Sequence, residues 1–352
     1  MTRDIQIAAV GTYSAATDES VHTVAVDSET GSMRHLDAVA AGPDPTFVTF
    51  HPSGEYLYAA VREDEEGVVR SYEVDRETGA LTERDGARSG AVAPCYCSVD
   101  ETGRYLFVAH YAGGAVSMLP LGPDGTIGPP SEVVEHEGSS VDPDRQTAPH
   151  PHSITLGPED RFAYVPDLGT DEVHVYVVER DEPSLSRVGA VDLAPGSGPR
   201  HLSFSPDGDR AYLINELDST VTVLDRGSDG LLTERSTVST LPSEFTSENK
   251  TAEIAVHPSG EYVYGSNRGL DTIVTFSVEE GSLARVGQTP TGGEWPRHFA
   301  VAPDGSRLFA ENRHTNEIVA FDVDAGTGAL SRTGESLSVP EPVCMQWLPG
   351  SD

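Results

Sequence analysis

Lysine is almost absent from the sequence, and positive charge is scarce. The 352 residues include 57 acidic and 23 basic side chains, a formal net charge of −34 at pH 7, and Lys250 is the one lysine. Such an acidic surface repels nucleic acids and anionic membranes, so we expect neither as a partner. We interpret the acidity as adaptation to high salt, where dissolved ions screen the repulsion between carboxylates. A surface that binds a basic partner is the alternative.

Cysteines and long apolar runs are also scarce. Cys95, Cys97 and Cys344 are too few and too scattered for a disulfide framework, and none forms the C-x-x-C pair of a zinc or redox site, so we expect buried thiols. No run approaches the roughly 20 apolar residues of a membrane span. The first residues lack the pattern of a signal peptide. We therefore expect a soluble, cytoplasmic protein that is a monomer or a weak homo-oligomer.

A repeat of about 50 residues is present instead. A tight turn such as Pro206-Asp-Gly208 separates two short strands, and it recurs six times, with steps of 49, 57, 48, 52 and 45 residues. Two further strands follow each pair. Residues 7–36 supply three strands of a seventh unit, and residues 342–348 supply its first strand, which closes the ring. The sequence predicts an all-β, seven-bladed β-propeller with four antiparallel strands per blade, as a single domain over residues 1–352.

The repeat gathers polar residues at one mouth of the propeller channel. A proline precedes the first strand of most blades. The residue directly after this proline is Thr46, Cys95, His152, Arg200, Arg297 or Val343. The end of each second strand holds Arg62, Tyr111, Leu168, Glu216, Arg268 and Arg313, and the residue before it is Asp167, Asn215 or Asn267 in three blades. Antiparallel pairing places strand starts beside strand ends, so Arg200 and Glu216 should be neighbours. Arginines on one rim of an acidic protein predict an anionic substrate; structural ion pairs between blades are the alternative.

Histidines add a second polar feature. His150 and His152 lie in the run Pro-His-Pro-His-Ser at residues 149–153, directly after an irregular insert. Acid–base or substrate-binding roles and a structural role remain open for them. No third ligand has a matching spacing, so we expect no metal site. We expect His201 and His298 to point away from the preceding arginines and to support them.

The motifs at 149–153, 165–171 (Val-Pro-Asp-Leu-Gly-Thr-Asp), 198–201 (Gly-Pro-Arg-His), 215–221, 257–269 and 295–299 (Trp-Pro-Arg-His-Phe) together resemble the seven-bladed lactonase family. That family includes propeller-type 6-phosphogluconolactonases and the fungal carboxy-muconate lactonising enzyme. The resemblance implies a catalytic set of His152, Arg200, Glu216 and Arg268, and no cofactor. Two positions near the expected mouth, Val61 and His110, differ from the asparagine usual in the family.

Lactone hydrolysis needs a base for water, a cation or donor for the oxyanion and an acid for the ring oxygen. Glu216 or His152 is the candidate base, and Arg200 or Arg268 the candidate oxyanion partner. The residues expected to bind substrate are His150, Arg297, Arg62, Tyr111, Asp167, Asn215 and Asn267. Without a G-x-S-x-G elbow, we expect water to attack directly. The predicted substrate is a small anionic lactone, 6-phosphoglucono-1,5-lactone first. The alternatives are a cycloisomerase acting on a carboxy-muconate-like polycarboxylate and a non-catalytic scaffold.

Overall fold

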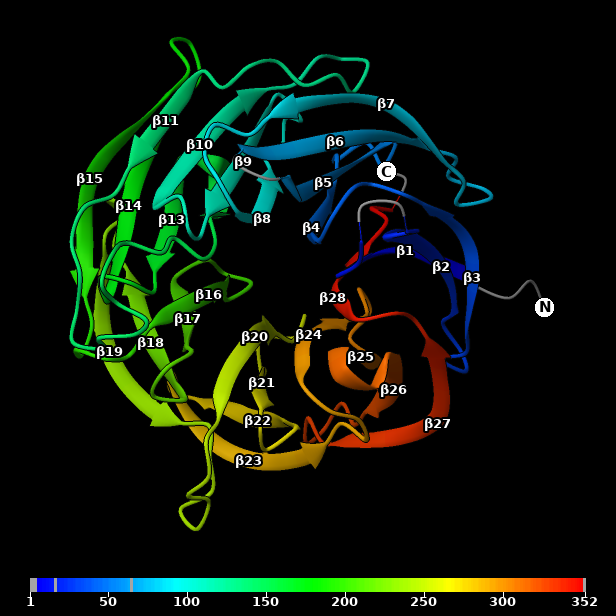
Figure 1. Cartoon of the computed structure of the whole chain (residues 1–352). Helices are drawn as coiled ribbons and strands as arrows, with labels where there is room; N and C mark the ends of the chain where they lie inside the picture. The colour runs from blue at the N-terminus through cyan, green and yellow to red at the C-terminus, as the bar shows by residue number, and fades with distance from the viewer. Residues whose placement is uncertain (1–4, 16–17, 64–65, 351–352) are drawn as a thin grey trace.

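Seven four-stranded antiparallel sheets form a ring around a central channel in the computed structural model, which describes residues 5–15, 18–63 and 66–350 (Figure 1). This arrangement confirms the predicted seven-bladed propeller. The first blade comprises β4 (Pro45–Phe50), β5 (Tyr56–Glu63), β6 (Glu66–Val74) and β7 (Leu81–Arg88). The second comprises β8 (Pro94–Val99), β9 (Tyr105–His110), β10 (Ala115–Pro120) and β11 (Glu132–Glu135).

The next four blades continue in chain order around the ring. The third blade comprises β12 (Thr155–Leu156), β13 (Phe162–Asp167), β14 (Glu172–Glu179) and β15 (Ser184–Asp192), and the fourth comprises β16 (Pro199–Phe204), β17 (Arg210–Asn215), β18 (Thr220–Arg226) and β19 (Leu232–Ser239). The fifth blade comprises β20 (Lys250–Val256), β21 (Tyr262–Arg268), β22 (Thr272–Glu279) and β23 (Ser282–Pro290). The sixth comprises β24 (Pro296–Val301), β25 (Arg307–Asn312), β26 (Glu317–Val323) and β27 (Leu330–Ser338). The helical segments of the described residues are the short 3-10 turns η1 (Pro158–Asp160) and η2 (Arg313–Thr315), and neither is long and apolar enough to cross a membrane.

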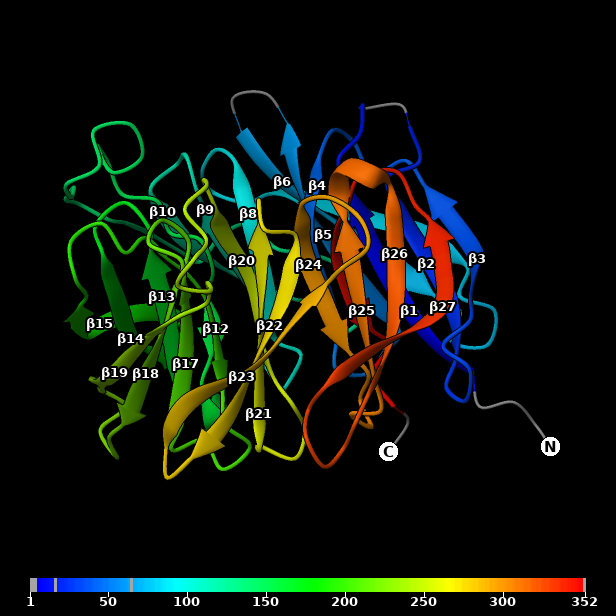
Figure 2. The same cartoon turned by 90° about the horizontal axis from the view of Figure 1, so that it is seen from below.

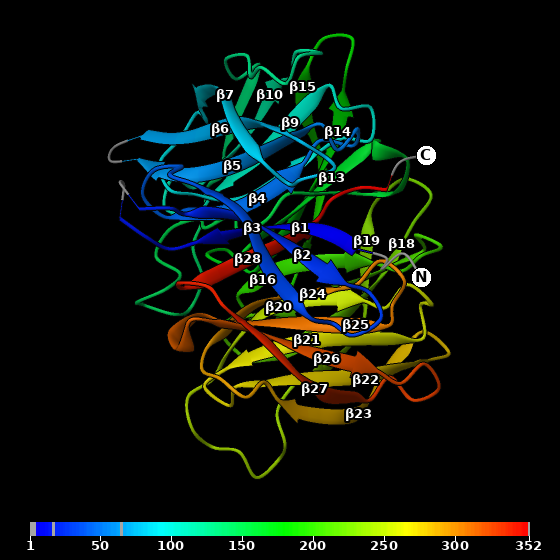
Figure 3. The same ribbon diagram turned by 90° about the vertical axis from the view of Figure 1, so that its right-hand side faces the viewer.

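The seventh blade joins the two ends of the chain. Its order is β28 (Pro342–Trp347), β1 (Ile5–Thr12), β2 (Val21–Asp27) and β3 (Met33–Val39). Ala8 of β1 pairs with Trp347 of β28, so strands from opposite ends of the sequence lie side by side (Figure 3). This pairing removes the exposed sheet edges that an open ring would leave.

Burial follows position within the blade. The second strands are mostly buried, and β9, β13 and β21 are buried at every residue, because each blade is covered on both faces by its neighbours. The outer strand β7 instead exposes most of its side chains. Apolar side chains pack between blades: Ala9 of β1, Val48 of β4 and Leu106 of β9 belong to one core cluster. Burying each aliphatic side chain of this kind contributes about 1.5–3 kcal/mol.

The turns that define the repeat require a left-handed residue at their third position. Gly208 takes this position with φ 72°, and Asp160, which replaces glycine in the third blade, takes it with φ 50°. The turns lie on one face of the ring. On the opposite face lie η2 and the ends of β5 and β6, which carry part of the functional site (Figure 2).

Candidate active site

A β-bulge at the start of the inner strand sets the direction of one side chain in several blades. Pro199 pairs with Asn215 and His201 with Ile214, which leaves Arg200 without a partner in the ladder. The same register shift leaves Cys95 in the second blade and Arg297 in the sixth without a partner in the strand ladder. A bulge interrupts the alternation of side chains and re-aims the extra residue. Of these three residues, Cys95 and Arg297 line the cavity described below.

A cavity of about 420 Å³ opens at this mouth. Its lining residues are Tyr13, Arg62, Cys95, Tyr111, Arg145, His152, Glu216, Lys250, Arg268, Trp295, Arg297 and Arg313. Six of these residues are cationic and one, Glu216, is anionic. The cavity therefore concentrates positive charge in a protein whose formal net charge is −34, and it includes the one lysine of the chain.

Glu216 is buried beneath this cavity and is surrounded by arginines. Its Oε1 lies 2.7 Å from Nη2 of Arg145, and its Oε2 lies 2.8 Å from Nη2 of Arg268 and 3.4 Å from Nε of Arg200. The predicted contact between Arg200 and Glu216 is thereby confirmed. Burial alone would raise the pKa of the Glu216 carboxyl, but the three guanidinium groups hold it far below its ordinary value. Glu216 is therefore a carboxylate at neutral pH.

A second group of arginines surrounds the ring of Tyr13. The guanidinium carbons of Arg62, Arg297 and Arg313 lie 5.6, 5.2 and 4.6 Å from the ring centroid. Arg313 also pairs with Glu341 at 2.7 Å. Within the described part of the chain, Arg62 and Arg297 have no carboxylate within ion-pairing distance. Both arginines line the cavity.

His152 lines the cavity opposite these cations. Burial, reinforced by Arg200 and His201, lowers the pKa of His152 well below its ordinary value, so its imidazole is neutral at pH 7. Its Nδ1 has no hydrogen-bond partner among the described residues. His152 does not lie in a regular strand. Pro149 and Pro151, on either side of His150, have no backbone N–H to pair, and β12 begins only at Thr155. A neutral imidazole keeps one unprotonated ring nitrogen, which can accept a hydrogen bond from water.

His150 and Arg145 both contact Tyr111. The rings of His150 and Tyr111 stack with centroids 4.4 Å apart, and Nη2 of Arg145 donates a 3.1 Å hydrogen bond to the Tyr111 hydroxyl. Sequence reasoning did not select Arg145, Tyr13, Trp295 or Lys250. The one signal for Arg145 was its place in the irregular insert directly before the histidines.

Four residues expected to bind substrate lie outside the cavity lining: His150, Asp167, Asn215 and Asn267. Asp167 accepts hydrogen bonds from the backbone N–H groups of His150 and Gly169. The Asn215 side chain donates to the hydroxyls of Thr220 and Thr222, and the Asn267 side chain accepts from Thr240 and Asn249. Direct substrate binding by Asp167, Asn215 and Asn267 stays a prediction, and their contacts hold the loops beside the site.

His110 and Val61, expected near the mouth, are not themselves in the cavity lining. His110 is buried and contacts Ser89 and Ala115, and Val61 is part of the core between blades. Each directly precedes a residue that lines the cavity, and alternation along the strand turns it to the other face. The two departures from the family pattern are therefore not in the cavity lining.

The cysteines are free and buried, as predicted. Cys95 is the one that lines the cavity, and its thiol donates to the carbonyl oxygen of His152 at 3.3 Å. Burial raises the pKa of the Cys95 thiol to about 11, so it is not a thiolate at neutral pH.

A possible set of metal ligands lies apart from the cavity. Ligand atoms of His136, Asp167 and His174 lie within 4.8 Å of one another. Both ring nitrogens of His136 already have partners, since Nδ1 contacts Asp167 at 2.7 Å and Nε2 contacts the Tyr176 hydroxyl at 2.9 Å. The hydrogen bonds satisfy His136 without an ion.

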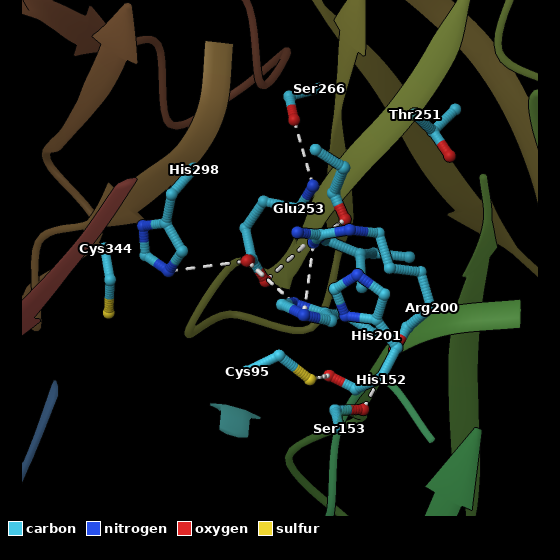
Figure 4. A network of polar contacts seen from close by, with 12 residues as sticks. Cys95, His152, Ser153, Arg200, His201, Thr251, Glu253, Ser266, His298 and Cys344 are labelled. Carbon is cyan, nitrogen blue, oxygen red and sulfur yellow. Dashed lines mark hydrogen bonds and ion pairs between the residues drawn. The ribbon is translucent and has the colours of Figure 1, made fainter. Parts of the chain in front are cut away.

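His201 does not point away from Arg200, as the sequence had suggested. Nη1 of Arg200 donates to Nε2 of His201 at 3.1 Å, and Nδ1 of His201 contacts Glu253 at 2.9 Å (Figure 4). The bulge at Arg200 explains the difference, because simple alternation does not hold across it. The ring of His298 differs from that of His201: its two nitrogens contact the carboxylates of Glu253 and Glu311 and not Arg297.

Comparison with known proteins agrees with this fold. Residues 7–347 match the family described as lactonase, 7-bladed β-propeller. The chain belongs to this lactonase family. It is 33% identical to the 6-phosphogluconolactonase of Bacillus subtilis over 96% of this chain and 97% of that one. The 6-phosphogluconolactonase of Pectobacterium carotovorum is 34% identical over 76% of this chain and 77% of its own. The structure of the periplasmic gluconolactonase of Pseudomonas aeruginosa superimposes with a TM-score of 0.91 at 31% identity, covering 98% of this chain and 99% of that one.

Proposed function

We propose that this lactonase-family propeller hydrolyses a phosphorylated sugar lactone, 6-phosphoglucono-1,5-lactone, to the open-chain acid. The observation that carries this assignment is the pairing of two features in one cavity. A neutral His152 lies on its wall, and Arg62 and Arg297, which have no ion-pair partner among the described residues, line the same space. Relatives named 6-phosphogluconolactonase support the substrate class.

His152 is the better candidate for the general base. Both carboxylate oxygens of Glu216 are occupied by arginines, which leaves neither of them available to an attacking water. His152 is neutral and has an unpartnered ring nitrogen. In this mechanism His152 removes a proton from the attacking water, and Glu216 orders the arginines around it.

Arg268 is the candidate oxyanion partner. It lines the cavity, its Nη2 is anchored by Glu216 and by the carbonyl oxygen of Thr251, and its guanidinium stacks 5.4 Å from the ring of Trp295. A fixed cation stabilises the negative charge that develops on the carbonyl oxygen as water adds. Arg200 is outside the cavity lining and acts through Glu216. Arg62 and Arg297 bind the phosphate, since arginine matches its oxygens in geometry and charge.

The test compares two lactones in two variants. We expect the wild type to hydrolyse fresh 6-phosphogluconolactone with a higher kcat/KM than unphosphorylated gluconolactone. Arg297→Gln should lower kcat/KM for the phosphorylated lactone about tenfold or more. The kcat/KM for unphosphorylated gluconolactone should stay nearly unchanged. Arg285→Gln, an exposed arginine on β23, is the matched control. Turnover of a carboxy-muconate-like acid without lactone hydrolysis would favour the cycloisomerase alternative.

A saline working environment is proposed from the acidic composition alone. A cytoplasmic location and a monomeric or weakly associated state stay predictions. Among the relatives, one structure is that of a periplasmic gluconolactonase.

A further inference from the structure

A chain of polar contacts links the catalytic rim to Glu253, a buried carboxylate outside the cavity lining. It runs from Glu216 to Arg200. From Arg200 it continues through His201 to Glu253 (Figure 4). Arg200 and His201 lie at the start of β16, Glu216 directly follows β17, and Glu253 lies in the middle of β20. Glu253 itself lies at a second bulge, between the pairs Thr251–Asn267 and Ile254–Gly265.

The protons along this chain can be assigned from the hydrogen-bonding groups. Burial opposes ionisation of Glu253, but His201 and His298 hold its pKa at about 2, so it is a carboxylate that only accepts. His201 must therefore donate from Nδ1. Burial and Arg200 lower the pKa of His201 to about 4, which leaves Nε2 unprotonated at neutral pH. That nitrogen accepts from Arg200, which can only donate.

We propose that His201 and Glu253 are positioning residues that fix Arg200 and, through it, Glu216. Nη1 of Arg200 is held by Nε2 of His201 and by the carbonyl oxygen of Ala252 at 2.6 Å. These two acceptors direct Nε of Arg200 toward Oε2 of Glu216. Glu216 in turn orients Arg145 and Arg268, which line the cavity. This inference rests on the proposed function for its effect on catalysis.

The sixth blade provides an internal comparison. His298 occupies the place after Arg297 that His201 occupies after Arg200, yet it contacts Glu253 at 3.4 Å and Glu311 at 2.8 Å instead of the arginine. Arg297 is left with the Tyr13 ring as its neighbour. Arg200 is held in place by its histidine, whereas Arg297 is free to adapt to a ligand. The position of Arg200 should therefore depend on His201, and the position of Arg297 should not depend on His298.

A double-mutant cycle between Arg200 and His201 tests the proposal. We expect His201→Leu to lower kcat about 10- to 100-fold with little change in KM, and His201→Gln, which keeps an acceptor near Nε2, to restore kcat to within about threefold. In the Arg200→Ala background, His201→Leu should change kcat less than about twofold. His257→Leu is the control, because this buried histidine contacts Ser259 and Gly305 away from the cavity. Equal effects of His201→Leu in both backgrounds would overturn the proposal.

A crystal structure of His201→Leu separates failure of this inference from failure of the proposed function. We expect the Arg200 guanidinium to move off the Ala252 carbonyl and away from Glu216. A guanidinium in its original place would overturn the positioning role whatever the activity. If Arg200→Ala leaves lactone hydrolysis unchanged while the guanidinium does move in His201→Leu, the positioning role stands and the catalytic assignment fails.

Discussion

Arg145 donates a 2.7 Å hydrogen bond to Oε1 of Glu216, although the two residues are 71 positions apart in the chain. Arg145 belongs to the insert that precedes β12, and Glu216 follows β17, so the contact joins two blades across the mouth of the cavity. The same guanidinium reaches the Tyr111 hydroxyl. The insert is therefore part of the site and not only a connection between blades.

Arg145→Gln should weaken catalysis. It removes one of the three cations that compensate Glu216, and hydrogen bonds to charged groups contribute about 1.5–3 kcal/mol, so we expect kcat/KM to fall about tenfold or more. Steady-state kinetics on the phosphorylated lactone measures this. Arg187→Gln removes an exposed ion pair with Glu172 on the outer part of a blade and should have no effect. Equal effects of the two substitutions would contradict a role for the insert.

Stability should decrease in acid through His201 and Glu253. Folding lowers both pKa values, to about 4 and about 2, from ordinary values of about 6.5 and 4.3. The unfolded chain therefore binds protons at a higher pH than the folded chain does, and the free energy of unfolding falls as pH decreases. We expect the part of this fall that comes from His201 to occur between about pH 6.5 and 4. The part that comes from Glu253 should occur between about pH 4.3 and 2. Urea denaturation at several pH values, with His201→Gln for comparison, checks this; an unchanged pH dependence in the variant would argue against it.

The Cys95 thiol should play no part in the reaction. Its pKa is raised to about 11 by burial, so a thiolate nucleophile is not available at neutral pH. We expect Cys95→Ala to keep kcat within about threefold of wild type, and intact-mass spectra taken during turnover to show no covalent adduct. Cys97→Ala, at another buried thiol, is the control for packing losses. A trapped acyl-enzyme would contradict direct attack by water.

Salt should stabilise the fold by screening. The excess of 57 acidic over 23 basic residues predicts mutual repulsion that weakens as the Debye length shrinks to about 3 Å at 1 M. We expect the urea midpoint to rise with KCl and to level off above about 1 M. A midpoint that does not depend on KCl would argue against salt adaptation, and a linear rise to several molar would point to exclusion of salt from the surface instead.

The sequence predicted the blades because each turn requires a left-handed residue, and Gly208 and its equivalents recur at nearly constant spacing. It predicted the proximity of Arg200 and Glu216 because antiparallel pairing fixes which strand ends meet. It did not predict Arg145 or Tyr13, because loops outside the repeat have no register to count from. It misplaced the His201 side chain, because a bulge interrupts the alternation on which the expectation depended.

The most direct test of the proposed mechanism is the hydrolysis of freshly generated 6-phosphogluconolactone, followed by pH-stat titration in molar KCl, for the wild type and His152→Gln. We expect the wild type to exceed the spontaneous rate and the folded variant to lose about 10²–10⁴-fold in kcat, the usual contribution of a general base. A wild type that does not accelerate the reaction would contradict lactonase activity at this cavity. A variant with unchanged kcat would contradict His152 as the base.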